Sequence, residues 1–122
     1  MNDTTLVNGK LRVELADSIE NVRSILSTAK QLYPVLMVGP PPCADEEQDK
    51  RNQRIVNLSK QFAVVCDQLN IPYLDIFPIL QKSKIWQNEA RANDGAHPRA
   101  AGYAEFAEIV QSWDGWLKLL TT

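Results

Sequence analysis

The segment Asp94-Gly95-Ala96-His97-Pro98 contains the residue types that proton transfer needs. A carboxylate stands three residues before an imidazole, in a tight turn near the start of a predicted helix. A carboxylate that accepts a hydrogen bond from Nδ1 of the imidazole fixes the tautomer of the ring and stabilises its protonated form. Gly95 allows the turn that would bring the two side chains together. The alternative is that Asp94 only caps the last helix and that His97 is an ordinary surface residue.

Asn2 is the second residue that could take part in chemistry. A side-chain amide at the carboxyl end of a strand can donate a hydrogen bond to a developing oxyanion. However, an Asn-Asp pair so close to a chain end is more typical of a frayed terminus. Residues 1–12 are polar, and they contain the turn signal Asn8-Gly9. The residues alone leave both interpretations of Asn2 open.

Length and composition exclude several classes of protein. The chain has 122 residues, and 13 Lys and Arg against 15 Asp and Glu give a formal net charge of −2. Such a length suggests one domain at most, and a slightly acidic chain without basic clusters is a poor candidate for binding nucleic acid. No apolar run approaches the roughly 20 residues of a membrane helix. With two cysteines and one histidine, a Cys/His zinc site is excluded, and no cofactor is expected.

The apolar pattern predicts alternating helices and short strands. Stripes at three- and four-residue spacing indicate helices, and short apolar runs without alternation indicate strands that are covered on both faces. A polar loop is expected to lead from the last strand region to Asn93. The predicted elements are a helix at about residues 14–33, a strand at 35–38, a helix at about 49–69, a strand at 72–76, one helical turn at 77–80 and a helix from about residue 98 to the tail.

This order predicts an α/β layered architecture with two parallel strands and flanking helices. Parallel sheets normally hold about 5–6 strands, so a sheet of two strands is incomplete and has open edges. We therefore expect either that a partner chain completes the sheet or that the chain is part of a larger domain. An isolated chain is expected to associate with itself through an open edge.

Four segments together resemble the SGNH (GDSL-type) hydrolases. Asn2-Asp3-Thr4-Thr5 resembles the end of the Gly-x-Asn-Asp block of that family, and Asp94-x-x-His97-Pro98 followed by Gly102-Tyr103 resembles its last block. Between them, a strand that ends in Gly39-Pro40-Pro41 and a strand that reads Tyr73-Leu74-Asp75 are similar to the family's fourth and fifth strands. Within the family, the likeness is greatest to bacterial GDSL-type lipase or acylhydrolase proteins.

The resemblance implies a fold, a reaction and a role for each candidate residue. The fold would be the C-terminal portion of a flavodoxin-like three-layer α/β/α hydrolase, and the reaction would be hydrolysis of carboxylic esters through an acyl-serine. His97 would be the general base, Asp94 would orient it, and Asn2 would donate to the oxyanion. Asp3 would be structural and would hold the turn.

The family's nucleophile block, Gly-Asp-Ser, does not occur in these 122 residues. The resemblance therefore implies that residues 1–122 form one partial domain, without the first three strands and without a nucleophile, and that this chain is inactive alone. None of its serines closely follows a glycine, and most are predicted on helices; they are Ser18, Ser24, Ser27, Ser59, Ser83 and Ser112.

Three hypotheses about function remain open. The chain is a truncated ester hydrolase, one half of a split enzyme whose other chain brings the serine, or a non-catalytic binding or assembly module. The nucleotides upstream of Met1 would discriminate among them. The sequence does not identify an ester substrate. The start of the chain has no basic segment followed by an apolar one, so we expect a cytoplasmic location.

Overall fold

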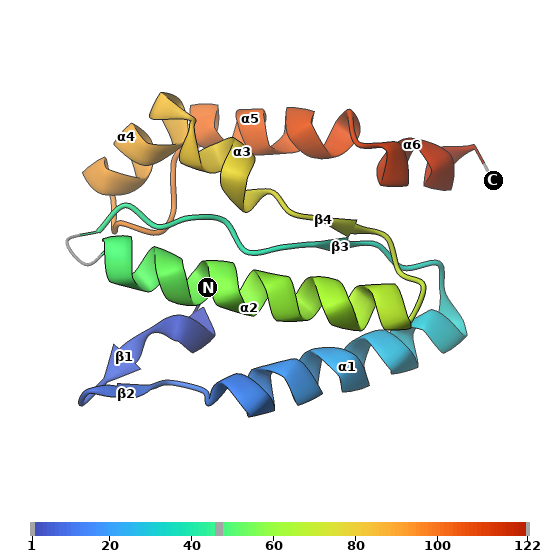
Figure 1. Ribbon diagram of the computed structural model, residues 1–122. Coiled ribbons are helices and arrows are strands. Elements are labelled where there is room, and N and C mark those ends of the chain that lie inside the picture. Colours follow the sequence, from blue (N-terminus) through green and yellow to red (C-terminus); the bar gives the residue numbers. More distant parts are fainter. Residues whose placement is uncertain (1, 46–47, 122) are drawn as a thin grey trace.

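The computed structural model describes residues 2–45 and 48–121. A short 3₁₀ helix and a two-stranded hairpin precede a series of helices that is interrupted by two short strands (Figure 1). In chain order the elements are η1 (Asn2–Thr4), β1 (Leu6–Val7), β2 (Lys10–Leu11), α1 (Leu15–Leu32), β3 (Met37–Val38), α2 (Gln48–Gln68), β4 (Tyr73–Leu74), α3 (Phe77–Gln81), α4 (Lys84–Ala92), α5 (Ala100–Gln111) and α6 (Asp114–Leu120).

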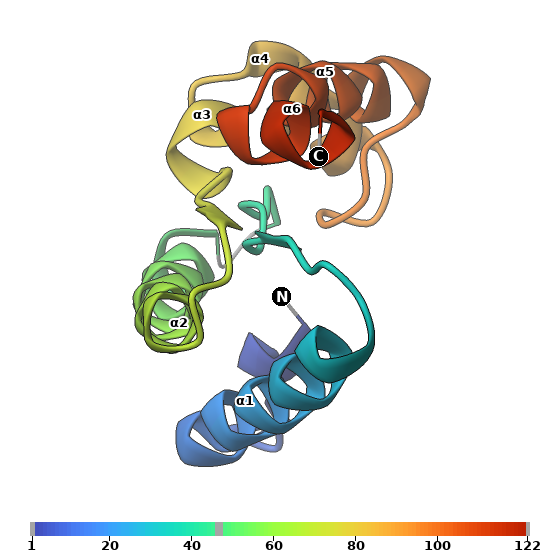
Figure 2. The same ribbon diagram turned by 90° about the vertical axis from the view of Figure 1, so that its right-hand side faces the viewer.

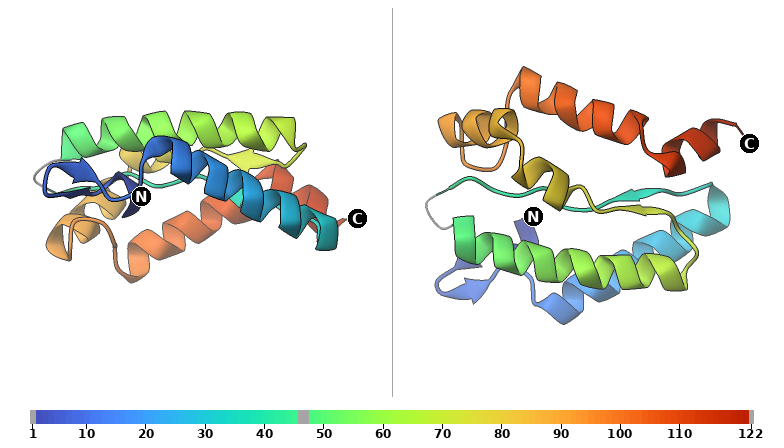
Figure 3. Two further views of the ribbon diagram at one scale, coloured as in Figure 1. Left: turned by 90° about the horizontal axis from the view of Figure 1, so that it is seen from below. Right: turned by 45° about the horizontal axis from the view of Figure 1, so that its top comes forward.

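The strands β3 and β4 lie between two groups of helices. They pair in parallel, with Met37 opposite Tyr73 and Val38 opposite Leu74. Seen end-on, α1 and α2 lie on one side of the strand pair, and α3 to α6 lie on the other (Figure 2). The right-hand view of Figure 3 shows the same separation. The predicted α/β class with two short parallel strands and flanking helices is confirmed.

Apolar side chains hold both groups of helices to the strands. On one side, Leu26 of α1 packs with Val65 and Cys66 of α2. On the other side, Leu80 of α3 and Trp86 of α4 are buried together, and Phe106 of α5 packs against them. The indole Nε1 of Trp86 donates a hydrogen bond of 3.1 Å to the carbonyl oxygen of Pro42. This bond ties α4 to the segment that follows β3.

The polar start of the chain is more ordered than predicted. Asn8 and Gly9 have positive φ angles of 54° and 77°, which suit the tight turn between β1 and β2. The turn predicted at Asn8-Gly9 is therefore confirmed. The interpretation of Asn2 and Asp3 as part of a frayed terminus is wrong, because both residues belong to η1. Contacts between residues far apart in sequence hold this segment, and the local pattern does not contain them.

The expected polar loop before Asn93 is instead the helix α4. Ser83 caps it, because the Ser83 hydroxyl accepts a hydrogen bond of 3.0 Å from the backbone N–H of Trp86. Only Trp86 and Ala90 are buried on this helix. Two apolar positions four residues apart make a stripe too short for the periodicity to reveal.

The C-terminal region is also divided differently from the prediction. The single helix predicted from about residue 98 to the tail is two helices: α5 begins at Ala100, and Trp113 separates it from α6. Residues 35–38 are only half-buried, although their unbroken apolar pattern is typical of a strand covered on both faces.

Among the described residues, no helix is long and apolar enough to cross a membrane.

Candidate active site

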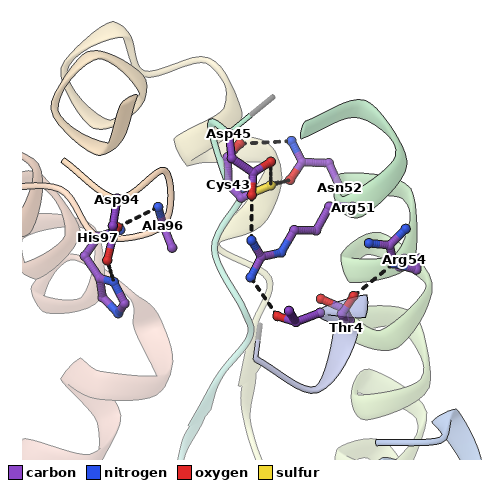
Figure 4. Close-up of polar contacts among 10 residues, drawn as sticks. Thr4, Cys43, Asp45, Arg51, Asn52, Arg54, Asp94, Ala96 and His97 are labelled. Atoms are coloured by element: carbon purple, nitrogen blue, oxygen red, sulfur yellow. Dashed lines mark hydrogen bonds and ion pairs between the residues drawn. The ribbon is translucent and has the colours of Figure 1, made fainter. Parts of the chain in front are cut away.

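Asp94 and His97 lie in the loop between α4 and α5, and their side chains meet. Nδ1 of His97 is 2.7 Å from Oδ2 of Asp94. The other carboxylate oxygen, Oδ1, accepts hydrogen bonds from the backbone N–H of Ala96 at 2.9 Å and of His97 at 2.7 Å. Figure 4 shows the Asp94 side chain turned toward both Ala96 and the His97 ring. The contact between the two side chains that the Asp-x-x-His spacing predicts is confirmed.

These donors determine the charge of the carboxylate and the tautomer of the ring. The backbone N–H groups of His97 and Ala96, together with the His97 ring, hold the pKa of Asp94 well below its usual range. Asp94 is therefore ionised at neutral pH, and an ionised carboxylate can only accept. The proton of the shared bond must then be on Nδ1 of His97. In the neutral ring, this leaves the lone pair of Nε2 free to act as a base.

The alternative, that Asp94 only caps the last helix, does not describe what is observed. Its two backbone donors, Ala96 and His97, precede the first residue of α5. The pair is open to solvent, since the side chains of His97 and Asp94 are 60% and 53% exposed.

Gly95 fixes the loop against the segment after β3. Its φ of +83° is in the left-handed region, which a residue with a side chain adopts at a cost. Its carbonyl oxygen accepts a hydrogen bond of 2.7 Å from the backbone N–H of Ala44. A Cβ at this position would lie 2.7 Å from Cβ of Asp45, so a side chain would clash there. Glycine is required both for the turn and for the close approach.

Contacts to α1 and α2 hold the segment that carries Asn2. The backbone N–H of Thr5 donates to the Asn2 carbonyl oxygen at 3.0 Å, which closes the 3₁₀ turn. Oδ2 of Asp3 accepts a hydrogen bond of 2.7 Å from the hydroxyl of Ser18. Nε of Arg54 donates to the Thr4 carbonyl oxygen at 3.0 Å. The bond from Ser18 to Asp3 agrees with the structural role that the family resemblance implies for Asp3.

Asn2 and His97 line the same open groove, which has a volume of about 480 Å³. Its walls are largely apolar, with Phe62 of α2, Trp86 of α4 and Tyr103 of α5 among them. The structure therefore places Asn2 and His97 along one groove, although they come from opposite ends of the chain, and Asp94 contacts His97 beside it. The arrangement offers a base and an amide donor at the edge of an apolar hollow.

The serines with the clearest partners bond to groups other than the imidazole. Ser18 bonds to Asp3, Ser59 shares a hydrogen bond of 2.6 Å with the hydroxyl of Tyr73, and Ser83 donates to Oε2 of Glu105 at 2.6 Å. Within residues 2–45 and 48–121, no serine is hydrogen-bonded to His97.

Cys43 lies near the loop, and its surroundings disfavour the reactive thiolate. It is buried, and Asn52 accepts from its backbone N–H at 2.9 Å. Burial and the neighbouring Asp45 raise the pKa of the thiol. A thiol with a raised pKa is a poor nucleophile at neutral pH.

Arg51 of α2 is a supporting residue that the sequence did not identify. It forms an ion pair of 2.6 Å with Asp45 and donates to the hydroxyl of Thr5 at 3.0 Å (Figure 4). It thus links the segment after β3, which holds Gly95, to the segment that holds Asn2. The pattern around Arg51 resembles an ordinary solvated helix face, and its partners become apparent only in the folded chain.

The match to known protein families agrees with this geometry. Residues 1–105 match the GDSL-like lipase/acylhydrolase family. The match covers most of the chain, so the chain belongs to the GDSL-like lipase/acylhydrolase family. No curated protein matches the chain. The resemblance inferred from the four sequence segments is therefore confirmed.

Proposed function

We propose that this chain supplies the base, its orienting acid and an oxyanion donor to a serine ester hydrolase, and that the nucleophile comes from outside these 122 residues. His97 is the general base, Asp94 orients it, and Asn2 donates to the oxyanion. The observation that carries the proposal is the 2.7 Å contact between Nδ1 of His97 and an ionised Asp94. Membership of a family of lipases and acylhydrolases supports ester hydrolysis as the reaction.

The proton transfers follow from the tautomer. Nε2 of His97 takes the proton of the serine hydroxyl as that oxygen attacks the ester carbonyl carbon, and Asp94 stabilises the resulting imidazolium. The imidazolium then gives the proton to the departing alcohol, which leaves an acyl-serine. A water molecule, deprotonated by the same nitrogen, then attacks the acyl carbon. The bond to the serine oxygen breaks, the imidazolium returns its proton to that oxygen, and the carboxylic acid is released.

Asn2 acts on the charge that develops during both steps. A tetrahedral intermediate carries a negative oxygen, and the Asn2 side-chain amide donates a hydrogen bond to it. Loss of one such donor typically costs about 10²–10³ in turnover. The apolar walls of the shared groove, including Phe62 and Trp86, suit the apolar part of an ester.

The isolated chain should have no esterase activity of its own. Loss of the nucleophile alone typically reduces turnover by about 10⁶, because the members of a catalytic triad act as a unit. Purified chain should hydrolyse p-nitrophenyl acetate no faster than an equal concentration of free imidazole. His97→Ala is the matched control and should remove only that background. Turnover well above the background, abolished by His97→Ala and accompanied by fluorophosphonate labelling of one serine, would place the nucleophile within this chain.

A search of the DNA upstream of Met1 separates the hypotheses about the missing nucleophile. A Gly-Asp-Ser block in the same gene supports a truncated hydrolase, and a block in an adjacent gene supports a split enzyme. Co-expression of the chain with that segment should then give esterase activity that Asp94→Asn and His97→Ala both remove. A segment that binds without restoring activity would favour the non-catalytic module.

We further propose that β3 pairs through its outer edge with another polypeptide, which in the isolated chain is a second copy. The backbone N–H groups of Met37 and Gly39 donate toward β4, to the carbonyl oxygens of Pro72 and Leu74. Successive N–H groups of a strand point in opposite directions, so the N–H of Val38 points away from β4. Residues 35–38 are also only half-buried, which supports a missing neighbour.

A further inference from the structure

Glu89 of α4 connects two helices across the loop that holds the candidate base. Its Oε1 accepts a hydrogen bond of 3.1 Å from the backbone N–H of Arg99 and one of 2.5 Å from that of Gly102. Both donors lie in the first turn of α5 or directly before it, where N–H groups have no partner within the helix. A carboxylate there is also favoured by the positive end of the helix dipole.

The absence of a side chain at Gly102 lets the Glu89 carboxylate and Pro98 approach the start of α5 closely. A Cβ on Gly102 would lie 3.0 Å from Oε1 of Glu89 and 2.5 Å from Cβ of Pro98. Both distances are shorter than side chains normally allow, so Gly102 must lack a side chain for Glu89 and Pro98 to pack there. Pro98 directly follows His97, and Glu89 is hydrogen-bonded to the backbone of Arg99, two residues after the imidazole.

A second contact also restrains the backbone next to the imidazole. The side-chain amide of Asn93 donates a hydrogen bond of 3.0 Å to the carbonyl oxygen of His97. The backbone of His97 is thus held by Asn93 on one side and, through Arg99 and Gly102, by Glu89 on the other. Glu89 is half-buried, which shields its hydrogen bonds in part from water.

We propose that Glu89 is a positioning residue, which holds the start of α5 so that the His97 ring stays on Asp94. The proposal rests on the proposed function, since the position of the ring matters for catalysis only if His97 is the base. Glu89 does not itself touch the ring. Its effect passes through Arg99, Gly102 and Pro98, and it should be visible as a change in the His97 tautomer.

Nuclear magnetic resonance can test this directly, because the chain contains a single histidine. In untagged protein, the ¹⁵N shifts of His97 should report one tautomer, with the proton on Nδ1. In Glu89→Ala the ring should move toward the tautomer mixture of free histidine. The backbone N–H of Gly102 should exchange with solvent about tenfold faster, as expected for loss of one charge-assisted hydrogen bond. Glu108→Ala, which removes an exposed carboxylate from α5, is the matched control and should change neither reading.

Two further variants distinguish positioning from general stability. Glu89→Gln keeps the side-chain oxygen and should preserve the single tautomer, whereas Glu89→Asp is one methylene too short and should lose it. An unchanged tautomer in a folded Glu89→Ala or Glu89→Asp protein would overturn the proposal, and so would its loss in Glu89→Gln. The His97 tautomer is measured without turnover. An unchanged tautomer in the Glu89 variants would therefore leave the esterase proposal standing. Conversely, a lack of esterase activity after co-expression would not change the tautomer measurement.

Discussion

Asp94 uses its two carboxylate oxygens for different purposes. Oδ1 accepts from two backbone N–H groups of its own turn, and Oδ2 accepts from the ring of His97. The first set of bonds fixes the carboxylate, so that the second fixes the imidazole. All three bonds span two or three residues, which explains how a pair that is more than half exposed to water keeps a defined geometry.

The first prediction concerns the titration of Asp94, whose pKa in the folded chain lies well below the ordinary value of about 3.9. The ordering that its bonds give the loop should therefore be complete above about pH 3.9 and be lost only as the pH falls through the lower folded value. Carboxyl ¹³C shifts of Asp94 between pH 1.5 and 6 would check this. In His97→Ala, which keeps the Ala96 donor and the residue-97 backbone donor, the titration should move partway toward the ordinary value. Titration of the unaltered chain near pH 3.9 would contradict the prediction.

The second prediction concerns Tyr73, whose hydroxyl bonds to Ser59 next to the strand pair. Burial raises the pKa of Tyr73 to about 12. An unfolded tyrosine ionises near pH 10, so between about pH 10 and 12 the folded state holds a proton that the unfolded state has lost. The free energy of unfolding should therefore fall as the pH rises through this window. Urea denaturation at pH 9 and pH 11 should show that the free energy of unfolding falls more for the unaltered chain than for Tyr73→Phe. Equal decreases would show that Tyr73 does not have a raised pKa in the folded chain.

At the scale of elements, the position of η1 depends on α1 and α2 rather than on its own sequence. A 3₁₀ turn of three residues has almost no stability of its own. Here the Asp3 carboxylate bonds to α1 through Ser18, and the Thr4 carbonyl bonds to α2 through Arg54. These bonds place Asn2 in the groove that also contains His97.

The third prediction tests this anchoring. Ser18 is buried, and Ser18→Ala would leave the half-buried Asp3 carboxylate without its hydroxyl donor. The free energy of unfolding should fall by about 1–2 kcal/mol, and the NMR signals of residues 2–5 should shift. Ser24→Ala, at an exposed position of the same helix, is the control and should change stability by less than about 0.5 kcal/mol. Equal effects of the two substitutions would show that the Asp3 contact does not hold the turn.

At the scale of the whole molecule, the sheet is small for the helices that it carries. The parallel sheet that the described residues form has two strands. Several large apolar side chains near the end of α1 are exposed, among them Ile25, Leu32 and Tyr33. An open strand edge beside exposed apolar groups favours association with another chain.

The fourth prediction is therefore that the isolated chain self-associates. Sedimentation should show dimers or larger species, and the melting temperature should rise with protein concentration. Leu36→Lys should weaken the association, because a charge near β3 opposes edge pairing. Ile79→Lys, at an exposed position of α3, is the control and should have no such effect. A compact monomer with a concentration-independent melt and no ANS binding would contradict the prediction and would favour the non-catalytic module.

The sequence by itself determined those features whose causes are local. Helical periodicity located α1 and α2 to within a residue or two. Asn70, just after α2, has a φ of 54°, a left-handed conformation that asparagine adopts more readily than most residues. The contact between Asp94 and His97 was predictable as well, since it spans three residues around the turn at Gly95. The family was equally accessible, because its motifs are short segments in a fixed order.

Only the tertiary structure decided what depends on contacts between distant segments. It showed that Asn2 is held in place, because Asp3, Thr4 and Thr5 bond to residues of α1 and α2. It revealed α4, whose stripe is too short for periodicity but whose Trp86 is buried against Phe106 and Pro42. It also identified Glu89, a residue that in sequence looks like any surface acid. Hydrogen bonds between distant segments produce no periodic pattern in a sequence. For that reason, only the folded structure shows how this site is assembled.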